Sequence, residues 1–153
     1  MSIDHPQIRI YTDGACSPNP GTGGWGAILT SADGGTKKEL SGSARETTNN
    51  RMEITAAIEA LRALKKPCKV DLFTDSEYVK NAFTAGWLAN WQRNGWRTAS
   101  RKAVLNADLW RDLLELSQIH DVSWHWVRGH GSNPMNNRCD ELAVAARMRL
   151  ARQ

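Results

Sequence analysis

The chain has 153 residues, of which 41% are hydrophobic and 24% charged, with a formal net charge of +4 at pH 7; this is the balance of an ordinary globular protein that folds as one domain. No apolar run approaches the roughly 18 residues that a membrane span needs, and the N-terminus lacks the basic-then-apolar pattern of a signal peptide, so we expect a single domain over residues 1–153 in the cytoplasm. Cys16, Cys68 and Cys139 are odd in number and form no CxxC pair, which argues against a disulfide framework or a structural zinc site.

The first third of the chain predicts an antiparallel sheet. Gln7–Thr12 alternates apolar and polar residues and leads directly into Asp13, as a half-buried strand does. Gly24–Leu29 and Thr36–Ser43 predict two further strands, and Asp33–Gly35 between them carries a hairpin turn signal.

A helix and a second kind of strand pairing are predicted next. Over Asn50–Lys66 apolar residues recur with the period of a helix, and Pro67 ends the run. Lys69–Thr74 is a short apolar strand that stops at Asp75, and Ser76–Ala85 has helical character. A strand–helix–strand unit places the strand before Asp75 parallel to a neighbour.

A basic, aromatic segment follows. Between Glu77 and Asp108 the sequence has no acidic residue. It holds eight basic or indole side chains: Lys80, Trp87, Trp91, Arg93, Trp96, Arg97, Arg101 and Lys102. Cations that release counterions, interleaved with rings, suit contact with a polyphosphate backbone. The alternative is a solvated basic helix whose tryptophans anchor it to the core.

The last part of the chain completes the fold prediction. A helix is expected near Asp108–Ser117, a strand at Val122–Arg128 and a final helix at about Met135–Leu150. A glycine- and proline-marked loop over residues 129–134 separates the last two. The fold class is therefore α/β, with a five-stranded mixed sheet of three antiparallel strands plus parallel strands, flanked by four or five helices.

Four carboxylates are candidates for one site. Asp13 and Asp75 each end a predicted strand in a Thr-Asp pair, and parallel neighbours would bring both to the same sheet edge. Glu53 and Asp140 flank the apolar stripes of two helices near their first turns. Turn, cap or helix-dipole roles are the alternatives for each alone. Gathered together, they would form the all-oxygen donor set that Mg²⁺ prefers.

His130 stands between two glycines, Gly129 and Gly131. Such a position exposes an imidazole and suits it to proton transfer or product release. A loop histidine without a chemical role is the alternative.

Five segments, in this order, resemble bacterial type I ribonuclease H. They are Tyr11–Gly21, Thr47–Glu53, Thr74–Val79, Trp126–Gly131 and Asn137–Ala143. The likeness spans Gln7–Arg147, and the ordered set is far more specific than any one segment. It implies the ribonuclease H-like fold and an endonuclease that hydrolyses the RNA strand of RNA–DNA hybrids.

The resemblance also implies the site chemistry. It carries four metal ligands onto Asp13, Glu53, Asp75 and Asp140, and a catalytic loop histidine onto His130. Two Mg²⁺ ions are expected about 4 Å apart, with Mn²⁺ as a substitute. Hydrolysis by two metal ions would leave 5′-phosphate and 3′-hydroxyl products.

Substrate contacts are implied at thirteen positions: Cys16, Asn19, Thr48, Asn49, Asn50, Glu77, Trp87, Arg93, Trp96, Arg97, Arg101, Lys102 and Asn136. The partner is an RNA–DNA hybrid, recognised through 2′-hydroxyls in the minor groove rather than base edges. We expect a monomer that requires no protein partner and no membrane.

The sequence departs from the family in two relevant places. Glu77 stands where members often have Gln, and Asn136-Asn137 stand where an acidic residue is common. Two other functions compete with the enzyme: a hybrid-binding protein without activity, and an integrase-like or exonuclease domain of the same superfamily. The latter share strand-end carboxylates but lack the Thr47–Glu53 motif and the basic segment.

Overall fold

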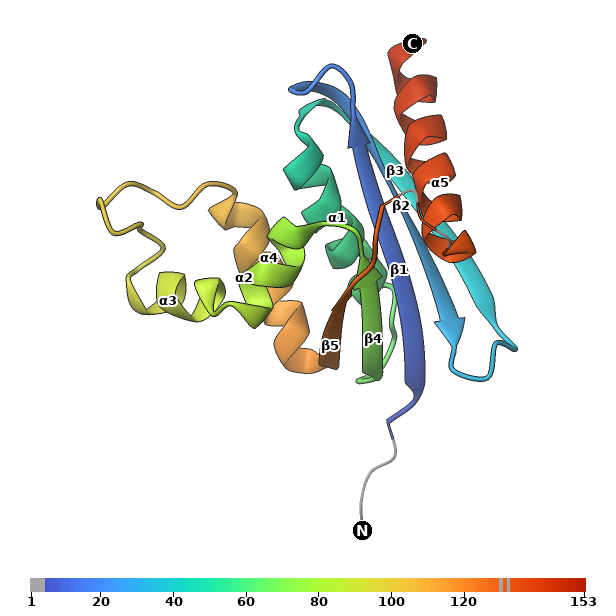
Figure 1. Cartoon of the computed structure of the whole chain (residues 1–153), viewed down its shortest axis with the longest axis horizontal. Helices are drawn as coiled ribbons and strands as arrows, with labels where there is room; N and C mark the ends of the chain where they lie inside the picture. Colours follow the sequence, from blue (N-terminus) through green and yellow to red (C-terminus); the bar gives the residue numbers. More distant parts are fainter. Residues whose placement is uncertain (1–4, 130, 132) are drawn as a thin grey trace.

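The computed structural model describes residues 5–129, 131 and 133–153, which form five strands and five helices (Figure 1). The strands are β1 (Gln7–Cys16), β2 (Gly21–Ser31), β3 (Lys37–Thr47), β4 (Lys69–Thr74) and β5 (Asp121–Trp126). The helices are α1 (Asn49–Arg62), α2 (Glu77–Thr84), α3 (Trp87–Arg93), α4 (Ala107–Ile119) and α5 (Pro134–Ala151).

The strands form one mixed sheet in the order β3-β2-β1-β4-β5. β1 pairs antiparallel with β2, and β2 with β3, whereas β4 runs parallel to both β1 and β5. The predicted antiparallel start followed by parallel strands is therefore confirmed.

Helices cover both faces of the sheet (Figure 1). α5 packs across β1, β2 and β3, while α1 contacts β1, β2 and α4 from the opposite side. Alternation along β4 shows the division, because Val70 and Leu72 are buried while Lys69 and Asp71 are exposed. The core between sheet and α1 is aliphatic, and Trp110 of α4 extends it.

The prediction that Asp13 ends its strand is wrong. β1 continues to Cys16 because it stays paired with β2, where Asp13 lies opposite Gly26. Only the pairing with β4 stops, at Thr12 opposite Thr74. Asp13 is thus the first residue of β1 that has β2 on one side and no β4 partner on the other.

The structure also tests the predicted end of the first helix and the state of the cysteines. α1 ends at Arg62 rather than Lys66, with Ala63 as its C-cap. The Leu64 N–H donates to the Leu61 carbonyl at 3.2 Å, and Pro67 disfavours helical geometry at Lys66, the residue before it. The three cysteines are free, which agrees with the argument against a disulfide framework, and all three are buried. Among the helices that the structure describes, none is long and apolar enough to cross a membrane.

Candidate active site

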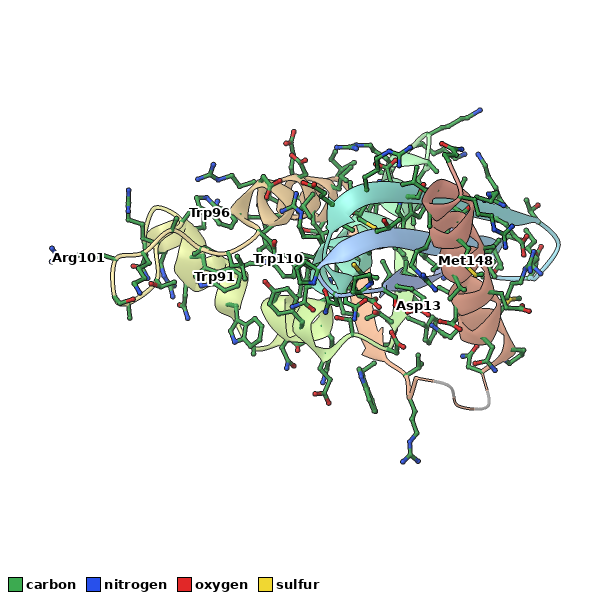
Figure 2. The ribbon with its side chains drawn as sticks, turned by 90° about the horizontal axis from the view of Figure 1, so that it is seen from above. Asp13, Trp91, Trp96, Arg101, Trp110 and Met148 are labelled. Atoms are coloured by element: carbon green, nitrogen blue, oxygen red, sulfur yellow. The ribbon has the colours of Figure 1, made fainter. Side chains whose placement is uncertain are left out.

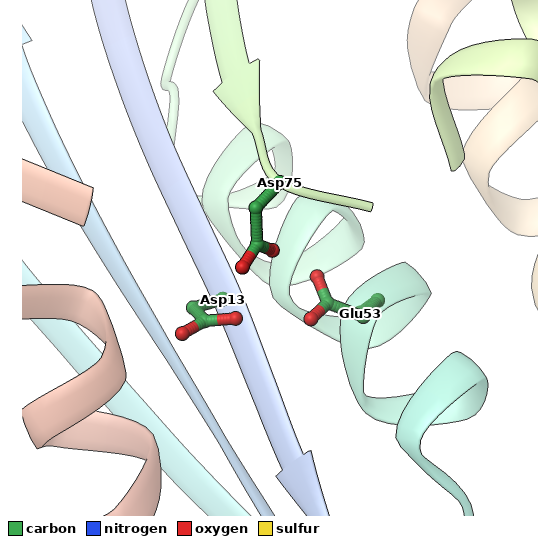
Figure 3. Close-up of side chains that lie close together, drawn as sticks. All are labelled: Asp13, Glu53 and Asp75. Atoms are coloured by element: carbon green, nitrogen blue, oxygen red, sulfur yellow. The ribbon is translucent and has the colours of Figure 1, made fainter. Parts of the chain in front are cut away.

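Three carboxylates from three elements converge beside the end of β4 (Figure 3). Asp13 comes from β1, Glu53 from α1, and Asp75 directly follows β4. One oxygen of each lies within 4.8 Å of the others. The parallel pairing of β1 with β4 brings the two aspartates together, as the sequence predicted, since Thr12 and Thr74 are register partners.

Gly14 allows Glu53 to reach this cluster. A Cβ atom at Gly14 would lie 2.6 Å from the backbone nitrogen of Glu53, so only glycine lets α1 approach β1 so closely. The Gly14 N–H donates to Asp13 Oδ1 at 2.9 Å and to Glu53 Oε1 at 3.0 Å. One backbone amide therefore orients both carboxylates.

Asp75 is held by the segments around it. The Thr74 hydroxyl accepts from the Ser76 N–H at 3.0 Å, which shapes the turn into α2. The Trp126 indole N–H donates to the Asp75 carbonyl at 3.0 Å. A Cβ atom at Gly129 would lie 2.8 Å from Asp75 Oδ2, so a side chain there would displace the Asp75 carboxylate from its present position.

The cluster is electrostatically costly without a cation. Asp13 and Glu53 are only 6% and 8% exposed. Burial raises the pKa of Asp13 to about 8; the hydrogen bond with Glu53 lowers it, and the charges of Asp75 and Asp140 raise it. Burial and then the charges of Asp13 and Asp75 raise the pKa of Glu53 well above its usual range. Glu53 Oε2 is buried and has no hydrogen-bond partner among the residues that the structure describes.

These features fit a bound divalent cation. Protons or cations must offset anions that are buried together, and carboxylate oxygens are the donors that Mg²⁺ prefers. Within the described part of the chain no group hydrogen-bonds Glu53 Oε2, so a cation could be bound by this oxygen. The cluster therefore suits a hard metal ion, as the resemblance implied.

Asp140 lies at the rim rather than in the tight cluster. It projects from α5 and its charge raises the pKa of Asp13. The hollow that contains all four carboxylates has a volume of about 380 Å³. Its lining consists of Asp13, Gly14, Asn49, Asn50, Glu53, Asp75, Ser76, Glu77, Tyr78 and Asp140. His130 lies outside the described residues.

The structure adds residues that the sequence arguments did not select. Ser76 and Tyr78 line the hollow, and Arg51 lines a second hollow of about 520 Å³ beside it, together with Thr48. The sequence could have indicated these residues, because Ser76 and Tyr78 lie in the motif that carries Asp75, and Arg51 lies in the motif that carries Glu53. Tyr78 lies in the first turn of α2, whose N-cap Ser76 follows Asp75 directly.

Several predicted substrate residues have structural partners. The Asn19 side chain accepts from the Asn49 N–H at 3.1 Å and ties the loop after β1 to α1. Thr48 caps α1 by accepting from the Arg51 N–H at 3.1 Å. The buried Cys16 thiol donates to the Pro18 carbonyl at 3.2 Å and therefore faces inward.

Asn136 is also buried, in the first turn of α5. Neither atom of its amide has a hydrogen-bond partner among the described residues. Its burial sets it apart from Asn49, Asn50 and Glu77, which are exposed and line the hollow.

Residues 87–102, the basic protrusion, extend away from the sheet (Figure 1). Arg93, Arg97 and Lys102 are exposed, and Figure 2 shows Arg101 at the outer end. Trp87, Trp91 and Trp96 are half-buried instead. The cations thus face solvent, while the indoles pack inward.

Comparison with known proteins agrees with this geometry. The RNase H family model matches residues 5–148. A ribonuclease H of Moorella thermoacetica is 60% identical over 147 residues, which cover 96% of this chain and 95% of that protein. One from Chlorobium luteolum is 63% identical over 140 residues, covering 92% and 94%.

Solved structures show the same fold. LC9-RNase H1, described as a type 1 RNase H with the type 2 active-site motif, superposes with a TM-score of 0.86 at 31% identity, covering 97% of this chain and 75% of that one. LC11-RNase H1, solved in complex with an RNA/DNA hybrid, gives 0.71 at 25% identity, covering 94% and 99%.

The chain therefore belongs to the RNase H family, and it is an enzyme, a hydrolase that acts on RNA in hybrids. Its identity to bacterial relatives places it among the bacterial type I ribonucleases H. The resemblance drawn from the sequence motifs is confirmed, as is the ribonuclease H-like fold.

Proposed function

We propose that the protein is an endonuclease that hydrolyses the RNA strand of RNA–DNA hybrids with two bound Mg²⁺ ions and leaves 5′-phosphate and 3′-hydroxyl ends. The observation that carries the proposal is the convergence of Asp13, Glu53 and Asp75, two of them buried, within 4.8 Å. Family membership supplies the substrate class.

The chain's own residues would hold the ions and place the phosphate. Asp13, Glu53, Asp75 and Asp140 all line one hollow and are the proposed ligands. Bound Mg²⁺ supplies Lewis-acid stabilisation of charge on phosphate oxygens and lowers the pKa of water. His130 is proposed to assist proton movement or product release, so its loss should slow turnover without abolishing it.

The rim of the hollow suits recognition of an RNA strand. The exposed side chains of Asn49, Asn50 and Glu77 lie beside the carboxylates, where polar groups can meet 2′-hydroxyls. Thr48 and Arg51 line the neighbouring hollow, which is a reasonable place for the backbone of the other strand. LC11-RNase H1 binds an RNA/DNA hybrid with the same fold.

Cleavage of an end-labelled hybrid tests the proposal. The natural chain should cut only the RNA strand, with Mg²⁺ but not in a metal-free buffer, and Asp13→Asn should lose this activity. Asp33→Asn, a change in an exposed hairpin turn, is the matched control and should cut normally. Binding without cleavage would favour the binding-protein alternative, and equal cleavage of a DNA duplex would favour another nuclease of the superfamily.

A further inference from the structure

Three cations of the basic protrusion lie on one self-bonded loop, residues 97–103, which we call the cationic loop. The Thr98 N–H donates to the Lys102 carbonyl at 2.8 Å, and the Arg101 N–H donates to the Thr98 carbonyl at 2.9 Å. The Arg97 guanidinium donates to the Arg101 carbonyl at 3.1 Å, and an isolated bridge joins the first and last residues of the loop. These bonds hold the three cations in one arrangement, so the loop can turn as a unit.

Trp96 attaches the cationic loop to the rest of the protein. Its N–H donates to the Trp91 carbonyl in α3 at 2.7 Å, and its own carbonyl accepts from the Val104 N–H at 3.0 Å. Val104, which follows the loop, is buried. Trp96 lies nearer the body of the domain than Arg101 does (Figure 2). The two ends of the loop therefore meet at Trp96, and the placement of this residue decides how the loop is aimed.

Arg111 of α4 lies over the ring of Trp96. Its guanidinium carbon is 5.2 Å from the ring centroid, a distance at which a cation is attracted to the face of an indole. The ring is half-buried and packs against the core, whereas Arg111 is exposed. Trp110, the preceding residue of α4, is fully buried, so the helix gives Arg111 a fixed base. A planar guanidinium can stack on an indole face in a way that an uncharged side chain cannot reproduce.

We propose that Arg111 is a positioning residue, which holds the Trp96 ring and thereby aims the cationic loop at the hybrid. This rests on the proposed function, in which the basic protrusion contacts hybrid phosphates. Without the Arg111 side chain the loop stays bonded to itself, but its attachment at Trp96 is held less firmly and its cations meet the phosphates less well. The carboxylate hollow keeps its own supports, so the chemical step is unchanged.

Binding and cleavage of a labelled hybrid by Arg111→Gln test the proposal. We expect Kd in EDTA and KM in Mg²⁺ to rise about two- to fivefold, the range that one exposed cation–π contact can supply, with kcat unchanged. Arg62→Gln is the matched control, because it also removes one exposed arginine, whose partner Asp112 is the residue after Arg111 in α4. It should leave both constants nearly unchanged. An unaltered Kd for Arg111→Gln, or the same rise in Arg62→Gln, would overturn the proposal.

A loop without its cations separates positioning from a direct contact between Arg111 and the hybrid. In the background Arg97→Gln, Arg101→Gln, Lys102→Gln, the Arg111→Gln change should add almost nothing to Kd, because no loop cation is left to be positioned. An equal rise in both backgrounds would make Arg111 itself a phosphate contact and overturn the proposal. A wild-type Kd for the three-fold variant would overturn the loop's role in binding, and the positioning role with it.

The measurement of Kd in EDTA does not depend on the chemistry of cleavage. If the natural chain bound the hybrid with the expected pattern of Kd but did not cut it in Mg²⁺, the proposed hydrolysis would be refuted and the positioning role upheld. Thermal unfolding should show both single variants folded at the assay temperature, since both arginines are exposed.

Discussion

The carboxylate hollow and the basic protrusion are built in opposite ways. The hollow gathers residues far apart in the sequence and buries two of its acids, where charge is costly and position decides the chemistry. The protrusion is one contiguous segment with exposed cations. Their attraction to phosphate acts over a long range, and each cation contributes only part of it. One substitution should therefore destroy the function of the hollow but only weaken that of the protrusion.

Glu53→Gln should have the largest effect. It replaces a buried carboxylate, proposed as a metal ligand, by a neutral amide whose oxygen can still accept the hydrogen bond from the Gly14 N–H, so folding should survive. We expect kcat to fall on the order of 10³-fold, since several kcal/mol of charge stabilisation depend on the ions. Glu59→Gln on the same helix, whose carboxylate pairs with Arg62, should leave kcat unchanged. A fall of less than tenfold for Glu53→Gln would contradict its role.

Gly14→Ala should disturb the hollow through packing. The new Cβ would meet the backbone of Met52 and Glu53 at under 3 Å, so β1 and α1 must separate at a cost of about 1–3 kcal/mol. We expect lower thermal stability and a higher Mg²⁺ concentration for half-maximal cleavage. Gly35→Ala, in the exposed turn between β2 and β3, is the control. An unchanged Mg²⁺ requirement in Gly14→Ala would show that the close approach does not matter.

The stability of the metal-free protein should fall as pH rises. The pKa of Asp13 is raised from 3.8 to about 8, so between these values the folded protein holds a proton that the unfolded chain has lost, and stability decreases with pH. Thermal unfolding in EDTA should show this decrease, and Asp13→Asn should reduce it. Added Mg²⁺ should stabilise the natural chain most at the upper end, because binding favours the ionised carboxylates. Stability rising over this interval would refute the assignment.

Arg101→Gln should have the smallest effect. Arg101 lies at the outer end of the protrusion (Figure 2), where one lost phosphate contact should raise KM about two- to threefold and lower the salt slope by about one. Arg149→Gln, an exposed change in the last turn of α5, should alter neither. A large fall in kcat for Arg101→Gln would mean that the protrusion acts in the chemical step and not only in binding, which would contradict the division of roles between protrusion and hollow.

The sequence by itself determined the local elements and the family. Alternation predicted the first strand, a short apolar segment predicted β4 with Asp75 directly after it, the helical period predicted α1, and the ordered motifs identified the ribonuclease H fold. These features depend on neighbours within a few residues along the chain, so periodicity and turn chemistry reveal them. The roles of His130, Asp140 and the substrate-binding residues stay predictions of the same kind.

Only the tertiary structure decided how these parts meet. Asp13 lies inside β1 rather than at its end because β2 continues to pair after β4 has stopped, and no local pattern encodes where a distant partner ends. The sequence could assign the tryptophans either to a nucleic-acid surface or to a core anchor; Trp87 packs on Tyr78 and Trp91 on Trp110. The contact between Arg51 and Asn106 spans 55 residues. Such contacts arise because the sheet and helices must close around one core, and that closure is a property of the whole chain.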